Sequence, residues 1–214
     1  MAADVCTDLL KTGDEIDKQA AQCIAVQFES YVRPSVAVEM KTINIVTPGP
    51  GLGRQYDRVA LILAPREEGR STKTNAVDDS VLIGTVNPSR QFVAPLLLEL
   101  KREALRQKRL ALFPQLTLKT YEHRVRQSGQ RLGYSAAKLS PHLFRHGGPS
   151  TDMFEGRLCI QDVQKRGHWG SFASVTRYEK HAKLLKVLGT MTALQKTRAT
   201  ASAKGLSKLM MSKV

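Results

Sequence analysis

The sequence predicts a mainly α-helical domain with a small three-stranded antiparallel β-sheet, an α+β fold. Several segments carry apolar residues at helical spacing, and short alternating segments cluster between residues 43 and 83. Hydrophobic residues make up 42% of the 214 residues, which is enough to bury a core. The clearest helical face, in the segment of residues 14–30, consists of Ile16, Ala20, Cys23, Ile24 and Phe28.

The first half of the chain is expected to hold two helices and the sheet. The helix over residues 14–30 begins with acidic residues, which suit the positive end of the helix dipole. Pro34 suits the first turn of a short helix over residues 34–40. Strands are predicted at residues 43–46, 59–63 and 80–83, with a polar hairpin turn over residues 65–79.

The second half is predicted to be helical. Ser140 and Pro141 resemble an N-cap and a first-turn proline, and the Gly147-Gly148-Pro149 sequence should shorten or kink the helix that follows. Helices are expected at residues 92–110, 117–132 and 160–166, and a last one from Ser171 that includes Tyr178. Residues 190–214 are basic and rich in small side chains, so we expect a flexible tail after a single domain of residues 1–189.

The composition favours a polyanionic partner. Lys and Arg number 33 against 19 Asp and Glu, a formal net charge of +14. Nucleic acid is the first candidate, and an anionic membrane surface or a ribosomal setting is the alternative. Cys6, Cys23 and Cys159 are too widely spaced for a disulfide framework or a zinc site, which fits a reducing compartment. Without a signal peptide or a membrane-length apolar run, we expect a soluble nuclear, cytoplasmic or nucleoid protein that is not secreted.

The residues with chemical potential lie between Ser140 and His181. His142 and Arg145 are three positions apart, so on a helix they share one face and can address one ligand. Gly167-His168-Trp169 follows, and Tyr178 comes nine residues after Trp169.

This order, H-x-x-R followed by Gly-His/Trp and then Tyr, resembles the second box of the tyrosine recombinases, the phage-integrase family. Arg33 stands before the predicted sheet, where that family has its first-box arginine, and Lys73 stands in the hairpin turn, where it has a lysine. The resemblance covers roughly residues 14–190 and implies the catalytic-domain fold of the family. The N-terminal DNA-clamping domain of full-length members is expected to be absent, because only 32 residues precede Arg33.

The resemblance implies that Tyr178 breaks DNA by forming a 3′-phosphotyrosyl ester, and that double-stranded DNA is the partner. Arg33 and Arg145 would stabilise the charged transition state, and Lys73 would protonate the leaving 5′-oxygen. His142, with His168 or Trp169, would donate to the phosphate, and His142 could instead take the tyrosine proton. No metal or cofactor is implied, and an active enzyme would self-associate on DNA as a tetrameric synapse.

The sequence departs from the family pattern in several places. Arg145 and Tyr178 are one residue further apart than usual, so both His168 and Trp169 stay candidates, with Trp169 preferred. Val36 stands where an acid is common, and Glu39 is its possible substitute. The alternatives are a catalytically degenerate DNA-binding remnant of a mobile-element recombinase and a type IB topoisomerase-like enzyme. Topoisomerases have K-x-x-R in this box, so His142 favours the recombinase.

A simpler interpretation of the same residues is structural. His142 and Arg145 could cap a helix and pair with Asp152, and His146 could be a structural or exposed histidine. In an active enzyme, by contrast, Arg33, His142, Arg145 and Tyr178 should converge on one pocket of the size of an anion.

Overall fold

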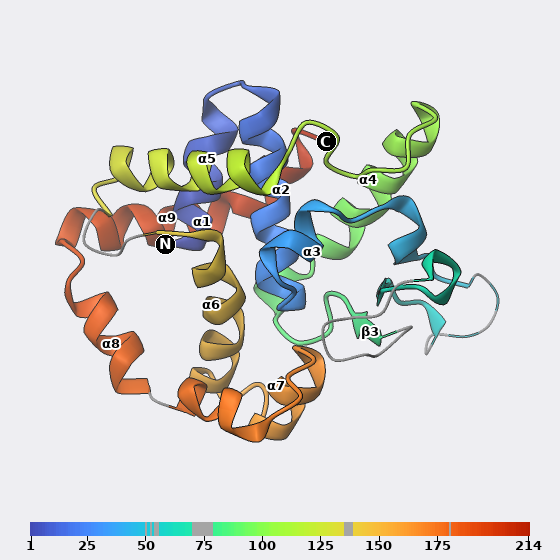
Figure 1. Cartoon of the computed structure of the whole chain (residues 1–214). Helices are drawn as coiled ribbons and strands as arrows, with labels where there is room; N and C mark the ends of the chain where they lie inside the picture. The colour runs from blue at the N-terminus through green and yellow to red at the C-terminus, as the bar shows by residue number, and fades with distance from the viewer. Residues whose placement is uncertain (50, 52, 54–55, 70–78, 135–138, 180) are drawn as a thin grey trace.

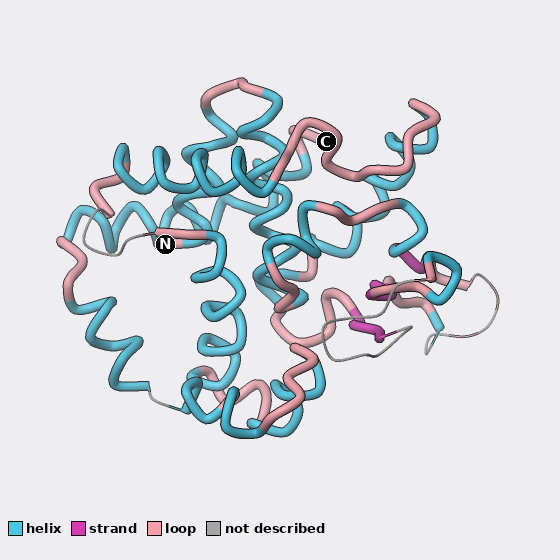
Figure 2. Tube along the Cα trace, in the orientation of Figure 1, coloured by secondary structure: helices cyan, strands magenta, loops and turns pink. Residues whose placement is uncertain are grey.

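The computed structural model describes residues 1–214 except residues 50, 52, 54–55, 70–78, 135–138 and 180. Figure 2 shows helices through most of the molecule and a small group of strands at one side. The predicted mainly α fold with a three-stranded antiparallel sheet is therefore confirmed. Among the described helices, none is both long enough and apolar enough to cross a membrane.

The α-helices differ from the predicted ones at the two ends of the chain and around Tyr178. They are α1 (Ala2–Lys11), α2 (Glu15–Ser30), α3 (Pro34–Val38), α4 (Val93–Arg106), α5 (Leu118–Arg131), α6 (Pro141–Phe154), α7 (Ile160–Arg166), α8 (His181–Gly189) and α9 (Ala193–Met211).

Helix α2 is the centre of the fold. The side chain of Asp14 caps it by accepting hydrogen bonds from the backbone N–H groups of Ile16 and Asp17. The helix is buried on nearly all sides, and α1, α5 and α6 pack around it (Figure 1). Helix α1 was not predicted, although Val5 and Leu9 are four residues apart and both fully buried.

The sheet has the order β1 (Ile45–Val46), β2 (Ala60–Leu63) and β3 (Asp79–Leu82), with both pairs antiparallel. Ile45, Leu61 and Val81 lie side by side across the three strands and are all buried. The first strand begins two residues later than predicted, because residues 42–44 form a 3₁₀ turn that the side chain of Asn44 closes onto Lys41.

Helix α6 runs without a break through Gly147, Gly148 and Pro149, so the predicted interruption is wrong. The two glycines serve close packing. A Cβ at residue 148 would lie 2.2 Å from the carbonyl oxygen of Phe28, so only glycine lets α6 approach α2 at this point. Pro149 costs the helix one hydrogen bond, to the carbonyl of Arg145, but the packing against α2 holds the helical course.

The predicted flexible tail is also wrong, because residues 193–211 form α9, which packs along α1 (Figure 1). Leu206 and Met210 of α9 are buried at helical spacing. The buried carboxylate of Asp4 in α1 accepts hydrogen bonds from Arg198 (2.8 Å) and Ser202 (3.0 Å) of α9. These contacts join residues almost 200 positions apart, which local periodicity does not reveal.

Candidate active site

Tyr178 lies in a 3₁₀ turn, η7 (Thr176–Glu179), and not in the α-helix predicted from Ser171. Another 3₁₀ turn, η6 (Phe172–Ser174), comes before it, and the next α-helix begins at His181. Val175, between the two turns, is fully buried. The two turns bring Tyr178 against α6.

The side chain of Tyr178 is enclosed, with 3% of the residue exposed. Its hydroxyl oxygen lies 2.7 Å from Nδ1 of His146, and its ring packs against Trp169 with a centroid distance of 5.1 Å. Burial raises the pKa of Tyr178 to about 12, although the positive charges of Arg145 and Arg177 act in the opposite direction. The resting tyrosine is therefore firmly protonated at neutral pH.

Arg145 is a buried cation beside this tyrosine. It donates hydrogen bonds to the backbone carbonyls of Tyr31 and Gly167, and its guanidinium lies 4.6 Å from the ring centre of Trp169. Among the described residues, no carboxylate pairs with Arg145. Burial, then the charge of Arg33, lowers the pKa of Arg145 to about 10. The structural interpretation that paired Arg145 with Asp152 is wrong.

Arg33 is the second cation of the site. It is the N-cap residue of α3, where Pro34 follows it, and its side chain is half-buried. Its charge reaches Arg145, and within the described part of the chain it has no carboxylate partner either. Two arginines that repel each other, with no carboxylate partner among the described residues, form a site where an anion would be stabilised.

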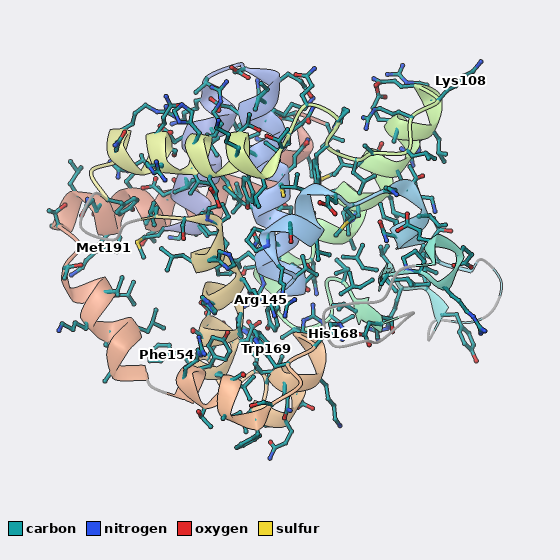
Figure 3. The ribbon with its side chains drawn as sticks, in the orientation of Figure 1. Lys108, Arg145, Phe154, His168, Trp169 and Met191 are labelled. Atoms are coloured by element: carbon teal, nitrogen blue, oxygen red, sulfur yellow. The ribbon has the colours of Figure 1, made fainter. Side chains whose placement is uncertain are left out.

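His168 and Trp169 occupy different environments, and Figure 3 shows both of them close to Arg145. His168 has a left-handed backbone, with φ of 52°, and its Nδ1 lies 3.1 Å from Oδ2 of Asp79 at the start of β3. Its Nε2 is buried and has no hydrogen-bond partner among the described residues. Trp169 instead places its indole between Arg145 and Tyr178, so its contacts are those of packing.

His142 does not join this group. It is exposed in the first turn of α6, and it makes no hydrogen bond or ion pair with a described residue. His146, one helical turn further on, is the histidine that meets Tyr178. It is half-buried, so it is not the exposed histidine of one expectation, and its contact fits the other, a structural histidine. The signal was present in the sequence, because residues 142 and 146 share a helix face. Lys73 lies outside the described residues.

A buried network of ion pairs contacts the site through Tyr31. The carboxylate of Glu29, fully buried in α2, pairs with Arg90 (2.9 Å) and Arg166 (2.7 Å). Asp152 of α6, also fully buried, pairs with Arg90 and accepts a hydrogen bond from the hydroxyl of Tyr31. Each carboxylate therefore faces a guanidinium, which is what burial of charge requires.

This network fixes Tyr31 at both ends. Its hydroxyl is held by Asp152, and its backbone carbonyl accepts from Arg145. Tyr31 also ends α2 in a left-handed conformation, with φ of 61°. The position of Arg145 thus depends on the buried network and not only on α6. Within the described part of the chain, no His, Cys, Asp and Glu side chains are grouped as a metal ion would require.

Comparison with known proteins identifies the fold. No protein-family model and no curated protein sequence matches the chain. The solved structures that resemble it include the site-specific recombinase XerH bound to its difH substrate in a pre-cleavage complex. That match has a TM-score of 0.61 and 13% sequence identity, and covers 89% of this chain and 51% of the XerH chain.

Two further structures agree with it. The post-cleavage complex of XerH with a palindromic difH substrate has a TM-score of 0.59 and 13% identity, over 88% of this chain and 51% of that one. The XerA recombinase has a TM-score of 0.51 and 15% identity, over 88% of this chain and 62% of that one. The chain spans about half the length of XerH and has the tyrosine recombinase catalytic-domain fold.

Proposed function

We propose that this protein breaks and rejoins double-stranded DNA through a 3′-phosphotyrosyl bond to Tyr178, as a site-specific recombinase or integrase. The observation that carries the proposal is the buried Tyr178 hydroxyl beside Arg145, which, like Arg33, lacks a carboxylate partner among the described residues. A phosphodiester supplies the negative charge that this pair of cations lacks, and the tyrosine supplies the nucleophile.

In the proposed reaction, the Tyr178 oxygen attacks the phosphorus and the bond to the 5′-oxygen breaks. The planar guanidiniums of Arg33 and Arg145 stabilise the charge that develops on the nonbridging oxygens. Lys73 donates the proton that the leaving 5′-oxygen needs. The tyrosine ester retains the energy of the broken bond, so a 5′-hydroxyl can reverse the reaction and rejoin the strand.

Of the two residues that could fill the Gly-His/Trp position, the contacts support His168 as the phosphate donor. Its Nε2 has no partner among the described residues, whereas the Trp169 indole packs between Arg145 and Tyr178. His142, exposed at the start of α6, is available to the DNA backbone.

The proposed partner is DNA in the nucleus or nucleoid, bound by a protein with a net charge of +14. The XerH structures that share the fold hold a difH substrate, which supports this choice. Affinity for duplex DNA should fall with salt at a log–log slope of roughly −0.9 per neutralised phosphate. Assembly of several copies into a synapse on DNA is part of the same proposal.

The experiment that tests the proposal is covalent trapping on a nicked duplex, from which the cleaved strand end diffuses away. The parent protein should form a protease-sensitive adduct, and mass spectrometry should locate the phosphate on Tyr178. Tyr178→Phe should abolish the adduct without loss of DNA binding. Tyr56→Phe is the matched control, because Tyr56 is an exposed tyrosine that should not affect the adduct.

A second candidate is a DNA-binding protein without catalysis, favoured by the enclosure of the Tyr178 side chain. Salt-dependent DNA binding by the parent with no adduct on any nicked substrate would select it. A topoisomerase-like enzyme would relax supercoiled plasmid through the same adduct without exchanging partners.

A further inference from the structure

We propose that His146 is the group that takes the proton of Tyr178 during DNA cleavage. The inference rests on the proposed function and names a catalytic residue for it outside the H-x-x-R motif. The observation that carries it is the 2.7 Å distance between Nδ1 of His146 and the hydroxyl oxygen of Tyr178.

The enclosed tyrosine needs a base. With a pKa of about 12, only about one Tyr178 side chain in 10⁵ is ionised at pH 7. A phenol attacks phosphorus well only as its proton leaves, and imidazole is the side chain that accepts protons near neutral pH. His142, the histidine of the motif, is exposed and makes no described contact with Tyr178.

The geometry suits proton transfer and not stacking. The ring centres of His146 and Tyr178 are 5.8 Å apart and the ring planes are inclined by 37°, so the close contact is between Nδ1 and the hydroxyl. The residues are held from separate elements, α6 and η7, which pack against each other. His146 needs no rearrangement to reach the proton.

The charges around the pair act on both ends of the proton transfer. Arg145 of α6 and Arg177 of η7 lower the pKa of the tyrosine hydroxyl, and Arg33 at the N-cap of α3 acts on Arg145. Positive charge favours the phenolate of Tyr178 and disfavours a positive imidazolium on its partner, and the negative charge of a bound phosphodiester would weaken both effects. The proton is therefore expected to leave as the tyrosine oxygen bonds to phosphorus.

The proposed step moves one proton from Tyr178 to His146 and a second proton to the leaving oxygen. The O–H bond of Tyr178 breaks and its proton passes to Nδ1 of His146, while the tyrosine oxygen bonds to phosphorus and the 5′-oxygen leaves. The leaving oxygen takes its proton from a different group, for which Lys73 is the candidate. On rejoining, the imidazolium returns its proton to the tyrosine oxygen as the ester is broken.

The test is the pH dependence of adduct formation in single turnovers with saturating nicked duplex. His146→Gln should slow the parent reaction by roughly 10²–10⁴-fold at neutral pH with little change in DNA affinity. The defect should shrink as the pH rises, because hydroxide then ionises the tyrosine. Free imidazole should partly restore His146→Ala. His123→Ala is the control, since His123 is exposed on α5 and should retain the parent profile.

A His146→Gln protein with the same rate and the same pH dependence as the parent would overturn the inference and leave the proposed function intact. If the parent protein itself forms no adduct, both the proposed function and this inference are contradicted. If the variants fold poorly, the parent protein can be tested without catalysis. Its ¹⁵N NMR resonances should show that Nδ1 of His146 carries no proton near neutral pH. A protonated Nδ1 that donates to the tyrosine oxygen would exclude His146 as the base.

Discussion

The indole of Trp169 occupies the space in which a side chain at residue 167 would lie. A Cβ on Gly167 would be 1.7 Å from the Cζ3 atom of Trp169, so an alanine cannot coexist with the ring as placed. Because the same ring contacts Arg145 and Tyr178, Gly167 keeps the two main residues of the site in place.

Gly167→Ala is therefore expected to displace Trp169 and to slow adduct formation at least ~10-fold, with a stability loss of about 1–3 kcal/mol. Trp169 is the one tryptophan of the sequence, so its fluorescence emission reports the displacement directly. Gly205→Ala in α9 is the control, because a Cβ there meets no atom within 4 Å and should slightly stabilise the helix. An unchanged emission spectrum and rate for Gly167→Ala would contradict this account of the site.

Asp152→Ala is expected to be one of the most destabilising single changes in the described part of the chain. It leaves Arg90 with one carboxylate instead of two and frees the hydroxyl of Tyr31, at a cost of about 3–5 kcal/mol. Urea unfolding measures the loss. Glu99→Ala is the control, because it removes an exposed ion pair with Arg102 and should lower the free energy of unfolding by less than about 1 kcal/mol. Equal losses of unfolding free energy in the two variants would argue against a structural role of the network.

His168 should make the folded state sensitive to acid. Burial lowers its pKa below the ordinary 6.5, with Asp79 acting against the shift and Arg145 adding to it. The unfolded state therefore takes up a proton first as the pH falls, and stability present above pH 6.5 is lost between that value and the folded-state pKa. The difference in unfolding free energy between pH 7.5 and pH 5.5 should be smaller in His168→Gln than in the parent. His123→Gln, an exposed control, should match the parent.

Lys73→Ala should slow cleavage of ordinary DNA by roughly 10²–10⁴-fold without weakening DNA binding, if this lysine protonates the leaving oxygen. Replacement of the bridging 5′-oxygen by sulfur removes the need for that proton, so the variant should then cleave almost as fast as the parent. Arg145→Ala should show no such recovery, because its charge serves the nonbridging oxygens. Equal defects on both substrates would assign Lys73 to phosphate binding, with Lys119, Lys138 and His168 as the remaining candidates.

Local sequence patterns predicted most of the fold, because hydrophobic periodicity and helix capping depend on residues that are close together in the chain. The helix of residues 14–30, the three strands and the helix of residues 160–166 follow from such signals. The continuous course of α6 could not be predicted, because it depends on contact between Gly148 and Phe28 of another helix. Helix α9 was missed although the sequence carries local signals for it, since Thr192 and Gln195 form a capping box and Leu206 and Met210 are four residues apart. Its packing onto α1, through the distant partner Asp4, could not be predicted locally.

The candidate site was only partly predictable. The motif identified Tyr178 and Arg145, which the structure brings together, and Arg33, whose charge reaches Arg145. Which histidine meets the tyrosine depends on the two 3₁₀ turns before residue 180, and helical spacing treats His142 and His146 alike. His168 and Trp169 could be separated only by their partners, Asp79 for one and Arg145 for the other.

The bond between Asp4 and Arg198 has a consequence for the order in which the protein folds during its synthesis. Asp4 is 1% exposed, and two of its three described side-chain partners lie in α9, so its carboxylate has only the hydroxyl of Tyr134 as a side-chain donor until the ribosome has released that helix. Helix α1 is among the first segments to emerge and among the last to reach its final place. A nascent chain arrested before residue 198 should therefore leave α1 accessible to proteases while α2, α5 and α6 assemble.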